Sequence, residues 1–172
     1  MSLSMYQASI PVLVRNLKVL SDLLSKGEKF ASEKGIDPQD ILDLRLAADM
    51  FPLTRQVQIA TDIAKGGAAR LAGVDVPSYP DTETTFGQLQ ERLAKTIGFL
   101  EGLPADKIDG SEDRPITMTA GTHELKFTGQ SHLLLFVLPN LFFHVTVAYS
   151  LLRQKGVQIG KIDFLGGANA FE

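Results

Sequence analysis

The chain of 172 residues contains no cysteine. This absence excludes disulfide bonds, zinc sites built from thiolates and catalysis by a cysteine nucleophile. A protein without disulfides fits a reducing compartment, so we expect a cytoplasmic location. The N-terminal segment, MSLSMYQASIPVLVRNLKVL, also lacks the basic start and the unbroken apolar centre of a secretory signal.

A concentrated positive charge is also missing. The formal net charge is −3, and no block of like charges occurs. Nucleic-acid binding requires a dense face of Lys and Arg, so we expect no nucleic-acid partner. Phosphate-binding loops, dinucleotide fingerprints and nucleophile elbows are absent too. The small residues of AKGGAARLAG, residues 64–73, lie in a predicted helix, where they favour close helix packing over phosphate binding.

One apolar run has no formal charge over twenty residues, Leu133 to Leu152. Its length alone would suffice to span a bilayer. Pro139, Asn140 and His144 interrupt the run, and no second segment of this kind exists. We therefore expect a buried helix and no membrane partner.

The period of the apolar residues predicts four long helices. Steps of three and four residues, typical of helices that pack at a shallow angle, cover residues 4–34, 38–72, 83–101 and 130–155. Pro11 either kinks the first helix or marks its start, and Pro52 is expected to bend the second. Asp37 should cap the second helix, whose apolar stripe includes Leu46.

Between the third and fourth helices the apolar residues alternate, in RPITMTAGTHELKF. An alternation of Ile116 and Met118 with Leu125 and Phe127 around Gly121 predicts a β-hairpin. We therefore predict an all-α protein, a four-helix bundle with a small β-hairpin between helices three and four. Residues 1–172 are expected to form a single domain.

Two segments carry a resemblance to a known family. DMFPLTRQVQIATDIAKGGAARLAG and LPNLFFHVTVAYSLLRQKGVQIGKIDFLG resemble a bacterial family of unknown function related to the DinB/YfiT-like metalloenzymes. The similarity covers nearly the whole chain. It implies a four-helix bundle in which three histidines hold a divalent metal, one from the second helix and two from the fourth, spaced H-x-x-x-H. Some members of that superfamily are thiol-dependent transferases or isomerases.

The resemblance places Asn140 and His144 at the two histidine positions of the fourth helix, counted back from LLRQKG. Their spacing of four projects both side chains from one face. The second helix has no histidine, and Gln56 or Asp49 could take that place. Such donors suit zinc or nickel poorly, so a metal at His144, with Asn140 and Gln56 nearby, would be weakly held. Tyr149 completes the candidate ligand pocket.

A structural interpretation of the same residues also stands. Asn140 and His144 could bond each other, a buried water or backbone, because Pro139 leaves a carbonyl one turn earlier without its usual donor. His123 and His132 have no partner at metal-binding spacing. Arg55 is expected in an exposed ion pair.

Two functions therefore remain open. The first is a small-molecule-binding or non-catalytic dimer with a degenerate metal site. The second is a metal-dependent transferase or hydrolase of the DinB/YfiT-like type that uses His144. A homodimer is expected because the apolar residues of Leu133–Leu152 occupy every side of the helix, while a bundle helix buries about half of its circumference. Either the hairpin or a second subunit should cover the rest.

Overall fold

The computed structural model describes residues 3–167, which are mostly helical and include one two-stranded hairpin. This confirms the expected helical class and the hairpin between the last two long helices. The elements are α1 Met5–Lys34, α2 Pro38–Leu42, α3 Leu53–Ala72, α4 Phe86–Glu101, α5 Ala105–Ile108, β1 Pro115–Ala120, β2 His123–Thr128, α6 Gly129–His132, η1 Leu133–Val137, α7 Leu138–Lys155 and α8 Lys161–Phe164.

Helix α1 begins and ends where its terminal residues dictate. Ser4 caps it through a capping box with Gln7, and Gly35 ends it in the left-handed conformation at φ 62°. The helix continues through Pro11, so the alternative of a start at that proline is wrong. The apolar stripe predicted for this helix is buried as far as Ala31, apart from the half-buried Tyr6 at its start.

The prediction of one bent helix over residues 38–72 is wrong. Asp37 caps a single short helix, α2, and the chain is then non-helical until α3 begins at Leu53. Pro52 accounts for the start of α3 at Leu53, because it lacks an N–H and disfavours helical backbone at the residue before it, but α2 already ends ten residues earlier. Leu46, predicted on the apolar stripe, lies in this irregular segment and is 46% exposed.

The third long helix, α4, starts three residues later than predicted. Thr85 is its N-cap and accepts a hydrogen bond from the backbone of Gln88. The predicted stripe is buried at Phe86, Leu89 and Leu93. The twelve residues before α4, 74–85, form an extended connection that we call the strap.

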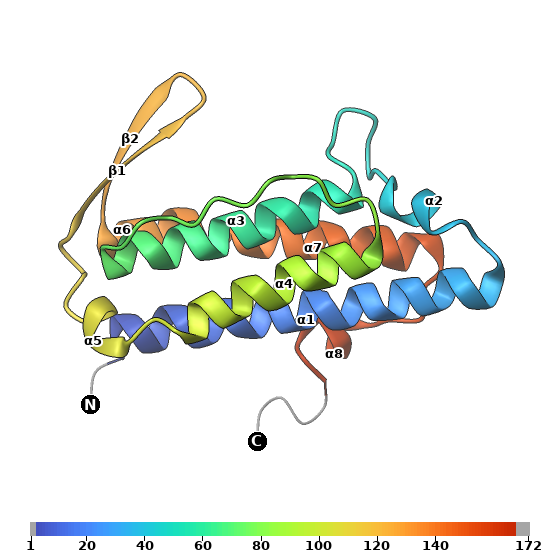
Figure 1. The fold of residues 1–172 in the computed structure, drawn as a ribbon, viewed down its shortest axis with the longest axis horizontal. Helices are drawn as coiled ribbons and strands as arrows, with labels where there is room; N and C mark the ends of the chain where they lie inside the picture. Colours follow the sequence, from blue (N-terminus) through green and yellow to red (C-terminus); the bar gives the residue numbers. More distant parts are fainter. Residues whose placement is uncertain (1–2, 168–172) are drawn as a thin grey trace.

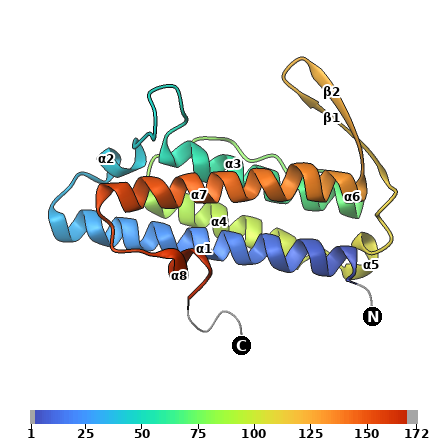
Figure 2. The same ribbon diagram turned by 180° about the vertical axis from the view of Figure 1, so that it is seen from behind.

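The four long helices lie side by side (Figures 1 and 2). Helices α1 and α3 each pack against α4 and α7. Helices α3 and α4 run in the same direction, because the strap returns the chain along their length before α4 begins (Figure 1). Gly67 permits a close approach of α3 to the fourth helix, since a Cβ there would lie 2.7 Å from Val137. The packing role predicted for the small residues is confirmed.

The hairpin projects from one end of the helices rather than lying along them (Figure 1). Its strands pair in antiparallel register with Met118 opposite Leu125 and Ile116 opposite Phe127. Only its base contributes to the core, where Ile116 is buried and Phe127 packs against buried residues. The hairpin therefore leaves the outer side of the fourth long helix uncovered, where Leu135 of η1 is 74% exposed.

The fourth long helix runs without a break from Gly129 to Lys155 and includes the π-helical turn η1. A π-turn just before Pro139 accommodates a residue that cannot donate to the helical ladder. By length and composition the helix could cross a membrane. In this fold it is instead a packing helix, with Leu133, Leu141 and Leu152 fully buried against its neighbours.

Candidate functional site

A hydrogen bond between α3 and α7 joins two of the predicted site residues. His144 Nδ1 lies 2.7 Å from Gln56 Oε1. Gln56 is fully buried in the first turn of α3, and His144 is half-buried in α7. The Gln56 amide is fixed in turn, because its Nε2 donates to the carbonyl oxygen of Phe51 at 3.0 Å. The pair is therefore anchored on the backbone that precedes α3.

These two hydrogen bonds determine which ring nitrogen of His144 carries the proton. Because the amide nitrogen of Gln56 donates to Phe51, the amide oxygen must be the acceptor for His144. His144 therefore carries its proton on Nδ1, and its Nε2 keeps a lone pair. Burial lowers the pKa of His144, and the neighbouring Arg55 guanidinium lowers that pKa further. The site presents a neutral imidazole whose Nε2 can accept a hydrogen bond or bind a Lewis acid.

The Asn140 side chain bonds to the backbone of its own helix rather than to His144. Its Nδ2 donates to the carbonyl oxygen of Phe136 at 2.7 Å, one turn earlier on the same helix. The bond is to the backbone, as the structural interpretation expected, but its acceptor lies three residues before Pro139 and is not the carbonyl four residues before it that Pro139 leaves without a donor. Asn140 and His144 share a helical face, but the amide nitrogen of Asn140 donates to the backbone and not to His144.

The other two candidates lie elsewhere. Asp49 is exposed in the irregular segment before α3. Tyr149 packs edge-on against Phe164 of α8, with ring centroids 5.9 Å apart. The structure thus brings together Gln56 and His144, and it places Asp49 and Tyr149 outside that contact.

The donor set beside His144 is poor in metal ligands. Among residues 3–167, no three His, Cys, Asp or Glu side chains converge as a metal ion requires. The oxygen of Gln56 is engaged by the proton on His144, so His144 Nε2 and the Asn140 amide oxygen are the donors left from the predicted set. Zinc sites in proteins use at least three nitrogen, sulfur or carboxylate ligands. The residues present therefore do not fit the three-histidine metal of the superfamily.

Sequence reasoning missed a second polar centre, between α3 and α4. Arg92 of α4 is almost completely buried, at 2% side-chain exposure. On the α3 side its Nε donates to Thr61 Oγ1 at 2.7 Å, and its Nη2 lies 2.8 Å from an Asp62 carboxylate oxygen. Lys65 pairs with the same carboxylate at 2.7 Å. A buried guanidinium is tolerated only with such partners.

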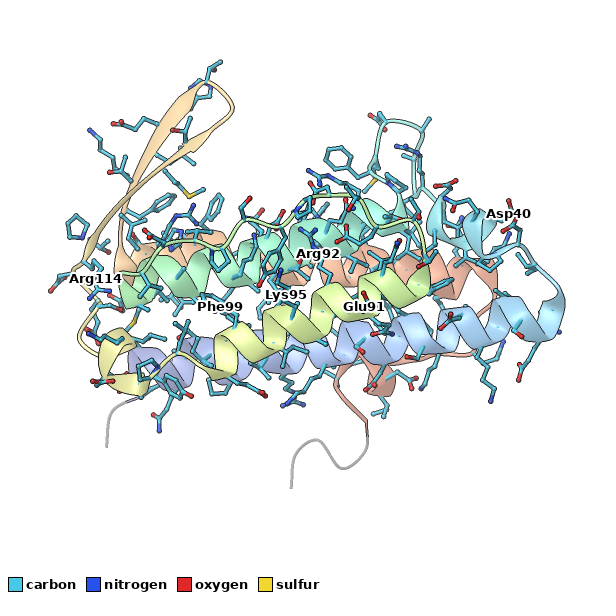
Figure 3. The ribbon with its side chains drawn as sticks, in the orientation of Figure 1. Asp40, Glu91, Arg92, Lys95, Phe99 and Arg114 are labelled. Atoms are coloured by element: carbon cyan, nitrogen blue, oxygen red, sulfur yellow. The ribbon has the colours of Figure 1, made fainter. Side chains whose placement is uncertain are left out.

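The strap supplies the remaining partners of Arg92. The Nη1 of Arg92 donates to the Pro80 carbonyl at 3.1 Å and to Glu83 at 3.0 Å, while its Nη2 lies 3.0 Å from an Asp81 carboxylate oxygen. The five N–H donors thus face five oxygen atoms. Burial alone would raise the pKa of Glu83, but the hydrogen bonds from Arg92 and Gln58 outweigh it and lower that pKa. Figure 3 shows Arg92 beneath the strap.

Two further contacts complete this centre. Arg55 pairs with Asp81 of the strap at the edge of this network. The two side chains are 35% and 36% exposed, so the exposed ion pair that we predicted for Arg55 is confirmed. The Tyr79 ring packs against cations, with Lys95 Nζ 4.1 Å and Lys65 Nζ 4.8 Å from its centroid. The available sequence signal was an acid-containing linker, YPDTE, followed within ten residues by an arginine beside the apolar stripe of the next helix.

His132, for which the sequence indicated no partner at metal-binding spacing, is fully buried without a hydrogen-bond partner on either ring nitrogen. It stacks on Phe136 and meets Phe127 of the hairpin edge-on. Burial lowers the pKa of His132 to about 4, and Arg70 contributes to that effect. The imidazole is therefore held neutral at the junction of the hairpin and the fourth helix.

We expect His132 to make the protein acid-sensitive. Between a pKa of 6.5 in the unfolded chain and about 4 in the folded protein, the unfolded state binds more protons. The free energy of unfolding should therefore fall as pH drops through this window, by at most about 1.4 kcal/mol per pH unit for this group. Between pH 7 and pH 5, the free energy of unfolding measured with urea should fall by about 2 kcal/mol less in His132→Phe than in the native protein. An equal loss in both proteins would contradict this role.

Comparisons with known proteins agree with the fold. A crystal structure of a DinB family member protein from Shewanella denitrificans is 38% identical in sequence and superposes with a TM-score of 0.85. The match covers 95% of this chain and 93% of that chain. No curated protein matches this sequence. The family model described as "Domain of unknown function (DUF1993)" matches residues 5–165. The chain therefore belongs to the DUF1993 family of unknown function, within the DinB-like superfamily.

Proposed function

We propose that this protein is a non-catalytic or small-molecule-binding member of the DinB/YfiT-like four-helix bundles, a cytoplasmic dimer that has lost its metal centre. The observation that carries this proposal is the bond between His144 Nδ1 and Gln56 Oε1. Gln56 is one of the two residues that could take the place of the missing histidine, and its amide oxygen is bound to His144. The site then offers a hydrogen-bond acceptor instead of a set of metal ligands.

The ligand that suits such a site is a small polar molecule with a hydrogen-bond donor for His144 Nε2. Support comes from a cleft of about 390 Å³ at the start of α3, whose lining includes Phe51, Arg55 and Gln58 but neither Gln56 nor His144. Phe51 anchors Gln56 through its carbonyl, and Arg55 acts on the charge of His144. The same two residues therefore belong to both the cleft and the surroundings of the imidazole.

The proposal is tested by ¹⁵N NMR of the histidine side chains. At pH 7 His144 should show a protonated Nδ1 and an unprotonated Nε2, which is the less common tautomer of free histidine. Gln56→Leu should remove that preference, since it removes the acceptor. Finding the proton on Nε2 in the native protein would reject the proposed site.

The alternative is a metal-dependent transferase or hydrolase that uses His144. A neutral imidazole with a free Nε2 is the form that binds metal, and this favours the alternative. It requires further ligands from outside the predicted set, because the Gln56 oxygen is engaged by His144 and Asn140 offers only its amide oxygen.

The dimer is supported by the outer face of η1 and α7, which we define as the exposed residues Leu134, Leu135, Pro139, Phe142 and Phe143. These residues lie on the fourth long helix, in the middle of Figure 2. Exposed apolar patches of this kind are typical of protein interfaces. A two-fold pairing of two copies through this face is the commonest arrangement.

We expect light scattering after size exclusion to give the mass of a dimer at micromolar concentration. A Leu135→Lys/Phe142→Lys variant should be monomeric, because it introduces unpaired charges into the face that the proposed dimer would bury. Leu46→Lys is the matched control, since it charges an equally apolar but separate exposed residue and should stay dimeric. A monomeric native protein would refute the pairing.

A further inference from the structure

The strap is held on the helices by charge rather than by apolar packing. None of residues 74–85 has a buried side chain, and Val74 and Val76 are exposed. Its ties to α3 and α4 are instead the ion pairs of Asp81 and Glu83 and the contacts of the Tyr79 ring with cations. A segment with so little apolar burial depends on these polar contacts to stay in place.

The surface beneath the strap is rich in cations. Arg55 and Lys65 come from α3, and Arg92 and Lys95 from α4. Two acids also belong to these helices, Asp62 within the network and Glu91 at its edge. The two strap carboxylates, on Asp81 and Glu83, therefore bring the local charge from an excess of two positive charges to zero. They face adjacent nitrogens of one guanidinium.

Solvent reaches this surface. A cleft of about 320 Å³ runs beside the strap and is lined by residues that include Tyr79, Glu83, Arg92 and Lys95. Figure 3 shows Arg92 and Lys95 on the same helix, with Glu91 beside them. A small anion in the cleft would therefore lie next to the guanidinium that the strap now occupies.

We propose that Asp81 and Glu83 occupy a binding site for a small dicarboxylate, formed by Arg92, Arg55, Lys65 and Lys95 between α3 and α4. The strap acts as an internal competitor, and a dicarboxylate that displaces it would take over its two contacts with Arg92. A guanidinium binds carboxylates through paired N–H groups, which favours such an exchange. This site shares Arg55 with the surroundings of His144, but it does not depend on the role of His144.

The first test removes the competitor. Asp81→Asn/Glu83→Gln keeps the shape of both side chains and frees the cations. Succinate titrated by NMR at constant ionic strength should bind this variant at least about tenfold more tightly than the native protein, because the strap no longer fills the site. Adding Arg92→Lys should abolish the gain. Glu101→Gln/Glu124→Gln is the control, since it removes two carboxylates from exposed ion pairs elsewhere.

No saturable succinate binding to the folded double variant, or equal binding by the control, would overturn the proposal. A second measurement uses the native protein and decides the matter if the variant does not fold. Succinate should accelerate amide hydrogen exchange in residues 74–85 relative to acetate at the same ionic strength. Equal exchange with the two anions would also overturn it.

Discussion

Replacement of Arg92 by methionine should lower the free energy of unfolding by about 3–5 kcal/mol. The guanidinium faces carboxylates on α3 and on the strap, so its removal leaves Asp62, Asp81 and Glu83 close together without their shared cation. The methionine fills most of the volume, but it cannot satisfy these oxygens. Breaking a buried pair from one side is costly for this reason.

Urea denaturation at pH 7 measures the effect. Lys18→Met is the matched control, because it removes a cation from the exposed pair with Glu101 and should cost about 1 kcal/mol or less. Arg92→Lys should fall between the native protein and Arg92→Met, since it keeps the charge and loses the planar fork. A loss below about 1 kcal/mol in Arg92→Met would mean that the network adds little to stability.

Acid should weaken the same network. The pKa of Glu83 is lowered in the folded protein, so its stabilising contribution is present above the unfolded value and is lost as pH falls through the folded one. The Arg92→Met variant has already lost the hydrogen bond that lowers this pKa. Its unfolding free energy should therefore decline less steeply in this acid range than that of the native protein.

A second large effect is expected from rebuilding the metal site. Gln56→His/Asn140→His would place a histidine at the open position of the fourth helix and at one of the two candidate positions before or in α3. Position 56 already meets His144, and position 140 lies one turn before it on α7. With Gln56 gone, neither ring nitrogen of His144 is committed to an amide. Three imidazoles form a competent site for zinc.

Calorimetry with zinc should give a dissociation constant of roughly micromolar or tighter for this variant, about 8 kcal/mol of binding free energy. Gln56→Leu/Asn140→Leu is the control for lost native bonds, and it should not bind. Absence of zinc binding by a folded double-histidine variant would show that the helices no longer support the superfamily geometry.

Local patterns predicted the long helices well because their burial follows directly from spacing. The stripes around Leu13, Leu20 and Leu93 are buried as their periods indicate. The prediction failed at residues 43–52, where apolar spacing continued but the chain is not helical until α3 begins after Pro52. Helical periodicity does not reveal whether a proline bends a helix or separates two, because that outcome depends on what the flanking segment packs against.

The candidate site was predictable only in part. Spacing paired Asn140 with His144, and the resemblance suggested Gln56 or Asp49 as their partner. The choice between the latter two needed the structure, because Asp49 lies in the segment where the helix is broken. Arg92 escaped notice because its partners come from a strap whose path along α3 and α4 is a tertiary feature. His132 escaped because burial without a partner leaves no local pattern.

The central claim is that His144 is engaged by an amide and is not part of a metal centre. The most direct test is the metal content of native protein purified without a polyhistidine tag and then equilibrated with zinc, nickel or manganese. We predict far less than one ion per chain, with no difference between the native protein and His144→Ala. One tightly held ion per chain that disappears in a folded His144→Ala variant would contradict this account.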